Sequence, residues 1–345
     1  MKKLKNFSKI KIVFRCDAAL KSNVGTGHLY RCIIIANYLQ KKFNIKKKHI
    51  LFFIKTDNEY KISRSILKDA NFNIYKINYK IKDFSLDEAK EISKIHANLL
   101  VIDRIGRVDR KFFEVIRKSF KKKIILECIS KERRLFDLSI NSLVIPNKKF
   151  YSDHLGFKYL ILNSFKETGN MNKKKKSIFL SFGGYDHNNL SEKILSCFQN
   201  INSKFEIYIP KVYGKKEIKN IKKHKLIYYK RDEYLKFYKK CEVAIVSGGL
   251  TLYDGIILKK KIICIPQYQH QLVNAKKINK SYNIKILDKN ASNFKKKFKS
   301  IFYKIYDSKL TNIKKRKSLI NKKNFKNTLE MIKKIYETSV NRRTI

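Results

Sequence analysis

Glycine, proline and tryptophan are scarce in this chain. Only 11 Gly, 3 Pro and no Trp occur among its 345 residues, whereas Lys, Ile, Asn, Tyr and Phe are abundant. We interpret this bias as the imprint of an AT-rich coding sequence. Because the composition selects against glycine, the positions that keep glycine are informative about local backbone geometry.

Long apolar runs are also missing. No run approaches the ~20 apolar residues that span a bilayer. The basic start "MKKLKNFSKIKIVF" has no extended apolar region of the kind found in a signal peptide. We therefore expect a cytoplasmic protein without an integral membrane segment, for which peripheral membrane contact stays open.

The six cysteines show none of the spacings that bind metal ions. They are spread along the chain and mostly fall in apolar segments, and a chain of this size does not depend on disulfides. The sequence therefore predicts buried free thiols in a reducing compartment and no cysteine-based metal site. The positions are 16, 32, 128, 197, 241 and 264.

Acidic residues are few. The chain has 81 Lys plus Arg against 28 Asp plus Glu, which gives a formal net charge of +53. Taken alone, this charge favours a nucleic acid or an anionic membrane as partner. The lysines, however, form no single tail or stripe, since they gather beside predicted helix ends and in loops. We interpret them as a solvated surface and expect no nucleic-acid partner, with a basic nucleic-acid-binding protein kept as an alternative.

Short β-branched apolar runs alternate with longer segments of helical period. Apolar strands of this kind are buried on both faces, and their alternation with helices predicts parallel α/β sheets. The chain also exceeds the size at which a single core stops growing. The polar segment "KETGNMNKKKK" interrupts the series and predicts a linker. We therefore expect an N-terminal domain at 1–165, a linker at 166–176 and a C-terminal domain at 177–345, helical from about 291.

The predicted elements follow this division of the chain. Strands are expected at 11–16, 50–55, 98–103 and 123–128 in the first domain, and at 177–182, 205–210, 225–229, 242–247, 261–266 and 284–287 in the second. Helices are expected at 28–42, 86–96, 109–119, 188–199, 233–240, 250–259 and 270–281.

Six of the eleven glycines form three pairs, each between a predicted strand and a predicted helix. Glycine at such a junction lets a ligand approach the backbone, and the helix start that follows suits a phosphate. Ligands of open parallel sheets bind at this carboxyl edge. Tight turns are the structural alternative, but three pairs across two domains favour binding loops for a nucleotide diphosphate. The pairs are Gly25 with Gly27, Gly183 with Gly184, and Gly248 with Gly249.

The stretch "VGTGHLYRC" (24–32) is neither a dinucleotide fingerprint, since Tyr30 replaces the third glycine, nor a P-loop. It places His28 in the first turn of a helix, where the dipole disfavours imidazolium. A neutral imidazole can act as a general base, and we assign that role to His28. Asp17 ends the first predicted strand, where it can orient His28 or bind a sugar hydroxyl. Arg31, one turn further on, either meets a phosphate or is a solvated helix residue.

The second half supplies further polar side chains at strand–helix junctions. In "SGGLTLYDG" (247–255) two hydroxyls flank the glycine pair, and an acid one turn into the helix can hold ribose hydroxyls. "HQLVNA" (270–275) puts a polar helix face after the next strand. "GGYDHNNL" (183–190) adds Asp186 and an asparagine, each of which is also a helix-capping residue. The candidates for binding are Asn189, Ser247, Thr251, Asp254, His270, Gln271 and Asn274.

These motifs resemble those of one enzyme family. "RCDAALKSNVGTGHLYRC" (15–32) resembles the N-terminal signature of the PseG/SpsG-type UDP-sugar hydrolases, R-x-D-(small)…G-x-G-H-x-x-R. "FGGYDHNNLS" (182–191) and "HLGFKYLIL" (154–162) resemble further segments of that family. "VSGGLTLYDGIILKKKIICIP" (246–266) with "HQLVNA" resembles the nucleotide-binding region shared with MurG-type glycosyltransferases. The likeness runs in order from about residue 10 to 290.

The resemblance implies a GT-B fold, with two Rossmann-like domains and the active site in the cleft between them. It implies hydrolysis of UDP-2,4-diacetamido-2,4,6-trideoxy-β-L-altrose at the anomeric carbon, releasing UDP on the route to pseudaminic acid in surface-glycan synthesis. The catalytic histidine would be His28, and Arg15 of the same signature would bind the substrate. The second domain would hold UDP through Gly248, Gly249 and Asp254, where many relatives have Glu. The scheme needs no metal and no cofactor, and we expect a monomer.

Three departures from the family pattern fall in the sugar-facing domain. The family's Ile-Asp is followed by an aromatic residue or by His-Tyr-Gly, whereas this chain has "VIDRIGRV" (101–108). Where the family has an Asp-Asp pair at the end of the next strand, this chain has "LECISKE" (126–132). Where the family has an Arg after the Tyr-x-Leu-Leu stretch, this chain has Asn163. These changes leave the sugar open. A glycosyltransferase that transfers from a UDP-sugar to a glycan or lipid acceptor is the main alternative, since the fold does not separate the two activities.

Overall fold

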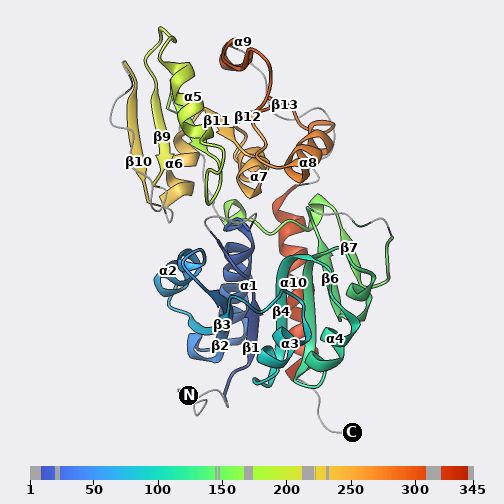
Figure 1. Ribbon diagram of the computed structural model, residues 1–345. Coiled ribbons are helices and arrows are strands. Elements are labelled where there is room, and N and C mark those ends of the chain that lie inside the picture. The colour runs from blue at the N-terminus through green and yellow to red at the C-terminus, as the bar shows by residue number, and fades with distance from the viewer. Residues whose placement is uncertain are drawn as a thin grey trace. The chain divides into compact units, whose positions relative to one another are not determined.

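The computed structural model describes residues 9–19, 24–143, 146, 148–166, 174–211, 221, 223–230, 233–307 and 320–340. The chain divides into two units, one made of Met1–Ile161 with Lys322–Ile345 and the other of Leu162–Asn321. Each unit is built around one parallel sheet (Figure 1). This architecture confirms the predicted pair of parallel α/β domains.

The first unit contains a seven-stranded sheet with the order β3-β2-β1-β4-β5-β6-β7. All of its strand pairs are parallel, so the carboxyl ends of the strands share one edge. The strands are β1 (Ile12–Arg15), β2 (Ile50–Thr56), β3 (Asn73–Asn78), β4 (Ala97–Gly106), β5 (Phe120–Cys128), β6 (Leu138–Asn141) and β7 (Asp153–Leu155). The helices are α1 (Gly27–Phe43), α2 (Lys61–Asp69), α3 (Leu86–Ile92), α4 (Arg110–Ile116) and α10 (Lys322–Val340).

The central strands of this sheet are buried on both faces, as their continuous apolar sequences predict. On one face, Val13, Phe53 and Ile102 pack with Ile92 of α3 and Phe112 of α4. The alternate residues of the same strands point to the other face, where α1 and α10 contact each other and β4. Burial of each such side chain contributes about 1.5–3 kcal/mol to the free energy of folding. The packed sheet therefore holds the loops at its carboxyl edge in place.

The second unit contains a six-stranded sheet with the order β10-β9-β8-β11-β12-β13, again with all strand pairs parallel. The strands are β8 (Ser177–Ser181), β9 (Glu206–Pro210), β10 (Lys225–Tyr229), β11 (Val243–Val246), β12 (Lys261–Cys264) and β13 (Ile284–Ile286). The helices are α5 (Leu190–Phe198), α6 (Tyr234–Lys240), α7 (Leu250–Ile257), α8 (Gln269–Asn279) and α9 (Phe294–Tyr306).

Aromatic side chains fill both sides of the second sheet. Phe198 of α5 and Phe302 of α9 meet with ring centroids 5.1 Å apart, in the cluster that covers one face. Tyr238 of α6 stacks on Phe179 of β8, with centroids 3.9 Å apart and an interplanar angle of 5°. Next to this stack, a Cβ on Gly255 of α7 would collide with the Tyr238 hydroxyl, so the helix needs glycine there.

The last helix corrects the predicted domain boundaries. Helical periodicity and chain order place the segment after about 291 in the second domain, whereas α10 belongs to the first unit. Tyr336 of α10 lies edge-on to Phe43 of α1, with ring centroids 4.7 Å apart, and Asn98 Nδ2 donates to Ser339 O at 3.1 Å. Periodicity reveals that a helix has an apolar face but not which sheet receives it.

The predicted strands and helices are present within a few residues, but β3, β6, β7 and α2 were not predicted. β3 lies at the edge of the sheet and buries only Ile77, so its sequence lacks an apolar run. β7 has three residues, too few for a pattern. Most of the predicted linker, residues 167–173, lies outside the described residues. In the part of the chain that is described, no helix combines the length and apolarity needed to cross a membrane.

Candidate active site

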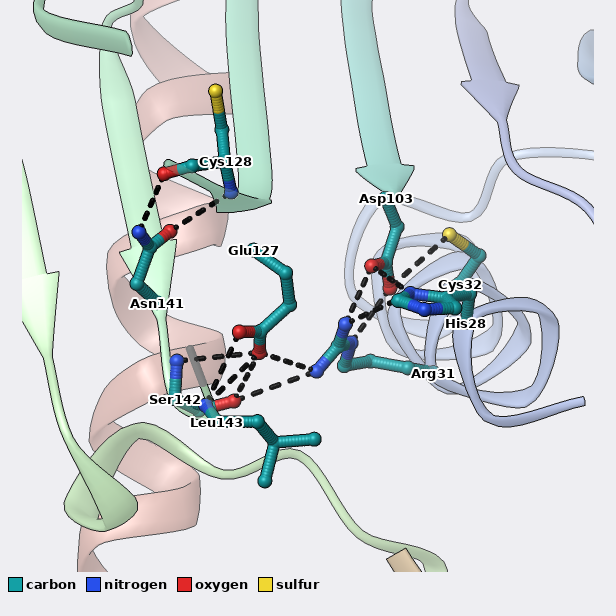
Figure 2. A network of polar contacts seen from close by, with 9 residues as sticks. All are labelled: His28, Arg31, Cys32, Asp103, Glu127, Cys128, Asn141, Ser142 and Leu143. Carbon is teal, nitrogen blue, oxygen red and sulfur yellow. Dashed lines mark hydrogen bonds and ion pairs between the residues drawn. The ribbon is translucent and has the colours of Figure 1, made fainter. Parts of the chain in front are cut away.

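His28 and Arg31 lie side by side in the first turns of α1, at the carboxyl edge of the first sheet. Their spacing of three residues puts both side chains on one face of the helix. Both contact Asp103 near the end of β4, the strand that pairs with β1. Figure 2 shows the three side chains converging from α1 and β4.

Asp103 orients the ring of His28. The distance from His28 Nδ1 to Asp103 Oδ1 is 2.8 Å; Asp103 is fully buried, whereas 17% of the His28 side chain is exposed. An ionised carboxylate only accepts hydrogen bonds, so Nδ1 of the unprotonated ring carries the hydrogen and Nε2 carries the lone pair. The nitrogen that can take a proton therefore points away from this contact.

Arg31 holds the carboxylate of Asp103, which in turn orients the ring of His28. Its Nε lies 2.6 Å from Asp103 Oδ2 and its Nη2 lies 2.5 Å from Asp103 Oδ1, a two-point ion pair. Burial by itself would raise the pKa of Asp103, but the Arg31 charge and the His28 contacts outweigh it and lower this pKa to about 2. Asp103 is therefore ionised at neutral pH. Of the two predicted roles for Arg31, solvated helix residue is wrong, because Arg31 is 3% exposed.

Glu127, at the end of β5, binds the other side of Arg31. Its Oε1 accepts hydrogen bonds from Arg31 Nη1 at 2.8 Å and from Ser142 Oγ at 2.6 Å. Its Oε2 accepts from Leu143 N at 3.1 Å. A buried network thus runs from His28 through Asp103 and Arg31 to Glu127 and the segment after β6 (Figure 2).

The backbone of Glu127 explains how its side chain reaches Arg31. Leu126 pairs in register with Asp103 and shares its face, so a regular strand would point Glu127 to the opposite face. Glu127 instead has φ of 58°, in the left-handed region, which costs a non-glycine residue about 1–3 kcal/mol. The turn brings the carboxylate to the face covered by α1. Such strain persists only where contacts hold it, and the hydrogen bonds to Glu127 do so.

Asp17 does not orient His28, which corrects one of its two predicted roles. Its Oδ2 accepts from Arg15 Nη1 at 2.6 Å and its Oδ1 accepts from Lys55 N at 2.8 Å. Arg15, predicted to bind substrate, is fully buried and also donates from Nε to Glu88 Oε1 at 2.8 Å. Both residues of the R-x-D motif therefore take part in a separate internal charge cluster.

Sequence reasoning missed Asp103 and Glu127 as site residues. Both stand at the ends of strands that were predicted, in segments noted only as departures from a family pattern. The available signal was chemical: an acid that ends a buried parallel strand lies at the ligand-binding edge. Which of these acids lies near His28 depends on the lateral order of the strands, which the sequence does not show.

The predicted residues of the second unit gather at one edge of its sheet. β8, β11 and β12 are neighbours, so the segments that follow them leave the sheet side by side. These segments carry Gly183 and Gly184, Ser247–Gly249 and the start of α8 with His270, Gln271 and Asn274. His270 is exposed, whereas Asn274 is buried.

Two of these glycines have structural reasons for being glycine. A Cβ on Gly248 would lie 2.7 Å from Gln271 O and 2.8 Å from Gln271 Cβ, so the loop after β11 and the first turn of α8 touch here. Gly183 has φ of +82°, which L side chains rarely adopt. A Cβ on Gly25, by contrast, would meet nothing within 4 Å.

The burial of Gly184 disagrees with its predicted role as a ligand-binding glycine. Gly184 is buried in the turn after β8, whereas Gly183 beside it is exposed. The sequence predicted that a ligand approaches the backbone at both glycines, but a backbone that the fold itself covers offers a ligand little surface. Gly183 is therefore the member of this pair that is better placed to contact a nucleotide, and Gly184 belongs to the packing of the turn.

The loop after β8 is fixed by its own side chains. Asp186 caps α5, since Oδ1 accepts from Leu190 N at 2.9 Å and Oδ2 accepts from Ser191 N at 2.7 Å. Asn189 stands at the N-cap position with φ of 48° and makes no side-chain cap. Capping is therefore the role of Asp186 that the structure shows.

Gln267, three residues after the end of β12, was not predicted as a site residue. Its Nε2 donates to Phe182 O at 2.6 Å and its Oε1 accepts from His187 N at 3.0 Å. Its backbone N–H donates to Gln271 Oε1 at 2.9 Å. Gln267 therefore ties the loop after β8 to the start of α8.

Asp254 is buried within α7 rather than open at the sheet edge. Its side chain is 3% exposed, and Oδ2 accepts from Tyr234 OH at 3.1 Å. Oδ1 has no hydrogen-bond partner among the described residues. Burial raises the pKa of Asp254 to about 6, although Ser164 and Tyr234 act to lower it. Thr251, one turn earlier, accepts at its backbone oxygen from Tyr238 OH at 3.0 Å.

The acids, histidines and cysteines of the described residues form no metal site. No group of three or more His, Cys, Asp or Glu side chains there can hold a metal ion. All six cysteines are buried free thiols, so the predicted burial of these side chains is confirmed.

Two proteins are similar to this chain in sequence. An uncharacterized protein of Methanocaldococcus jannaschii is 29% identical over 293 residues, which cover 76% of this chain and 56% of that protein. The spore coat polysaccharide biosynthesis protein SpsG of Bacillus subtilis is 24% identical over 277 residues, covering 73% of this chain and 76% of SpsG. The chain therefore spans little more than half the length of the first relative. No protein-family model matches the chain.

Solved structures of MurG and of a rhamnosyltransferase are among those that share this fold. MurG of Acinetobacter baumannii superposes with a TM-score of 0.59 at 14% identity, over 95% of this chain and 99% of MurG. Spinosyn rhamnosyltransferase SpnG complexed with thymidine diphosphate superposes with a TM-score of 0.54 at 9% identity, over 95% and 96% of the two chains. At these identities the likeness concerns the fold alone. With the two parallel sheets, it identifies the GT-B fold and confirms the predicted fold class.

Proposed function

We propose that this GT-B protein is an enzyme that acts on a nucleotide sugar, with His28 as general base at the anomeric carbon. The observation that carries the proposal is the contact of His28 Nδ1 with the buried Asp103, itself held at two points by Arg31. The likeness to SpsG, named for polysaccharide biosynthesis, and to SpnG, a rhamnosyltransferase complexed with a nucleoside diphosphate, supports it.

In the proposed hydrolysis, water attacks the anomeric carbon. The bond from that carbon to the phosphate oxygen breaks, and UDP leaves with the bonding electron pair. Nε2 of His28 takes the proton from the water as the new C–O bond forms. Asp103 keeps the ring in the required tautomer and stabilises the imidazolium that results. Arg31 holds Asp103 ionised and in place.

The nucleotide is assigned to the carboxyl edge of the second sheet. Helix starts there offer backbone N–H groups and a positive dipole end to a diphosphate. At α5, however, Asp186 already accepts from the N–H groups of Leu190 and Ser191. Gly249, in the loop that leads into α7, and the start of α8 are therefore better placed to hold the phosphates, whereas Gly248 is buried against Gln271.

The finer assignment is hydrolysis of UDP-2,4-diacetamido-2,4,6-trideoxy-β-L-altrose or a similar UDP-sugar. It rests on the resemblance of residues 15–32 to the N-terminal signature of the hydrolase family, with residues 246–266 resembling the nucleotide-binding region that this family shares with MurG-type glycosyltransferases. Glycosyl transfer is the second candidate, because SpnG is named a rhamnosyltransferase and shares the fold. In that reaction His28 would take the proton from an acceptor hydroxyl in place of water.

The deciding experiment measures UDP release from a panel of UDP-sugars by the purified chain, without an acceptor. Release from at least one sugar is expected, and His28→Ala should abolish it while UDP binding, measured by calorimetry, survives. Release that begins only when a sugar or lipid acceptor is added favours the transferase. Activity of His28→Ala within a few fold of the unmodified chain removes His28 from the role of base.

A further inference from the structure

A second buried charge cluster lies on the other face of the first sheet. Arg15 of β1 pairs in register with Phe53 of β2 and Ile102 of β4, so these residues share a face. Lys55 and Arg104 follow two residues later on the same strands and lie on that face too. Three cations from three adjacent strands therefore converge at the carboxyl edge, on the face opposite Asp103.

Two buried acids, Glu88 and Asp17, accept hydrogen bonds from the arginines of this cluster. Glu88 Oε1 accepts from Arg15 Nε and from Arg104 Nη2, each at 2.8 Å. Asp17 Oδ2 accepts from Arg15 Nη1 at 2.6 Å. Three cations against two buried acids leave one positive charge without a buried counterion.

Asp83 supplies the third negative charge, from a partly exposed position rather than a buried one. It belongs to the segment between β3 and α3, and its side chain is 41% exposed. One oxygen, Oδ1, lies 2.5 Å from Lys55 Nζ, 2.6 Å from Arg104 Nη1 and 3.9 Å from Arg15 Nη2. The same carboxylate oxygen is shared by all three cations.

Several donors in the cluster remain without a hydrogen bond. Arg15 Nη2 and Arg104 Nε are buried and have no hydrogen-bond partner among the described residues, and Arg104 Nη1 contacts Asp83 Oδ1 only as an ion pair, without hydrogen-bond geometry. Arg15 is 0% and Arg104 is 5% exposed. A buried donor without an acceptor destabilises the folded protein, and a charged donor does so more strongly. A single shared oxygen of Asp83 cannot give each donor its own acceptor, whereas a tetrahedral oxyanion has several oxygens to offer.

The backbone next to Asp83 is held in a strained form. Phe84 has φ of 59°, a left-handed conformation that is rare for an aromatic residue. The Phe84 ring packs under the Arg104 guanidinium at 4.9 Å, and Phe84 N donates to Glu88 Oε2 at 2.7 Å. The conformation that carries Asp83 to the cations is therefore maintained by the cluster itself.

We propose that Arg15, Lys55 and Arg104 form a binding site for a phosphate-type oxyanion, in which Asp83 is the exchangeable internal counterion. The oxyanion takes the place of the Asp83 carboxylate, and Glu88 and Asp17 continue to fix the two arginines. The ligand is a phosphate group, free or carried as an ester. The site is separate from His28 and does not depend on the proposed reaction.

The test uses the full chain with inorganic phosphate as the probe. Asp83→Asn removes the counterion, and Asp87→Asn makes the same change in net charge four residues later, at an exposed position in the first turn of α3. At constant ionic strength, calorimetry should show phosphate binding at least tenfold tighter for Asp83→Asn than for the unmodified chain or Asp87→Asn. Adding Lys55→Met to Asp83→Asn should abolish that gain.

Equal phosphate affinities for Asp83→Asn and Asp87→Asn would overturn the proposal. If Asp83→Asn does not fold in chloride buffer, its refolding yield is compared in phosphate and chloride at equal ionic strength. A higher yield in phosphate supports the site, and equal yields reject it. A sugar phosphate serves as a second probe. If it binds tighter than inorganic phosphate, the ligand is a phosphate ester; if inorganic phosphate binds tighter, the ligand is free phosphate.

Discussion

Asp103 Oδ1 is shared by Arg31 Nη2, at 2.5 Å, and His28 Nδ1, at 2.8 Å. The arginine and the histidine come from one helix, three residues apart, and the aspartate comes from a strand more than 70 residues later. A guanidinium bound at two points leaves a carboxylate little freedom to rotate. The direction of the histidine ring is therefore set, through Asp103, by an arginine of the same helix.

Replacement of Asp103 by Asn should lower kcat for UDP release by about 10³–10⁴, with KM within a few fold, because an amide no longer enforces the required tautomer. Steady-state UDP release measures both constants. Asp17→Asn is the matched control, since Asp17 contacts Arg15 and the Lys55 backbone instead. Its kcat should change by less than about tenfold. A larger loss in Asp17→Asn than in Asp103→Asn would return the orienting role to Asp17.

Replacement of Glu127 by Gln should lower the free energy of unfolding by about 3 kcal/mol, because it leaves a buried guanidinium without one of its counterions. Urea unfolding followed by circular dichroism gives this value. The control is Glu114→Gln, whose carboxylate is 40% exposed and pairs with Arg117 on the surface of α4. That change should cost about 1 kcal/mol or less. Equal losses in the two variants would contradict a structural role for the Glu127–Arg31 pair.

Replacement of Asp254 by Asn should stabilise the protein at pH 7.5 and have little effect near pH 4. Burial raises the pKa of Asp254 to about 6 in the folded state. The folded chain then holds this proton more tightly than the unfolded chain, so stability is full below about pH 4 and is lost as pH rises through about 6. The shift corresponds to about 3 kcal/mol at neutral pH.

Urea unfolding of Asp254→Asn and the unmodified chain at the two pH values measures this difference. Asp288, an exposed acid whose Oδ1 accepts from Asn290 N, provides the control variant Asp288→Asn. The control should show no gain in stability between pH 4 and 7.5. A pH-independent difference for Asp254→Asn would mean that Asp254 is ionised in the folded protein.

Replacement of Gly248 by Ala should lower the free energy of unfolding by about 1–3 kcal/mol, as overpacking does elsewhere. The added Cβ would lie 2.7 Å from Gln271 O, a backbone atom that cannot yield without moving the start of α8. Thermal unfolding provides the measurement. Gly25→Ala is the comparison, because its Cβ meets nothing within 4 Å. Its effect on stability should stay under about 1 kcal/mol.

The sequence was sufficient to predict the two sheets and the edge at which the site residues lie. Continuous apolar strands and the glycine pairs mark the carboxyl ends of β1, β8 and β11, and these positions follow from chain order alone. The partner of His28 could not be predicted in the same way. Asp17 is nearer in sequence, but β4 lies next to β1 and brings Asp103 to the helix. Strand order depends on packing of the whole sheet, which a local pattern does not encode.

Two further features depend on the same long-range packing. Glu127 reaches Arg31 only because its φ is 58°, and neither the residue type nor its neighbours predict a left-handed conformation in a strand. Arg15 has the sequence context of a binding residue. Its burial against Glu88 of α3 depends on a helix 73 residues away. An arginine that binds a ligand and one that completes an internal cluster look the same in the sequence.

The return of α10 to the first sheet has a consequence for the order of folding during synthesis. The first unit needs both ends of the chain, whereas the second is a continuous segment, Leu162–Asn321. The ribosome therefore releases a complete second unit before the segment that contacts β4 and β5 has emerged. Until Lys322–Val340 is made, the first sheet keeps an apolar surface uncovered. A nascent or truncated chain that ends before Lys322 would present that surface to chaperones and proteases.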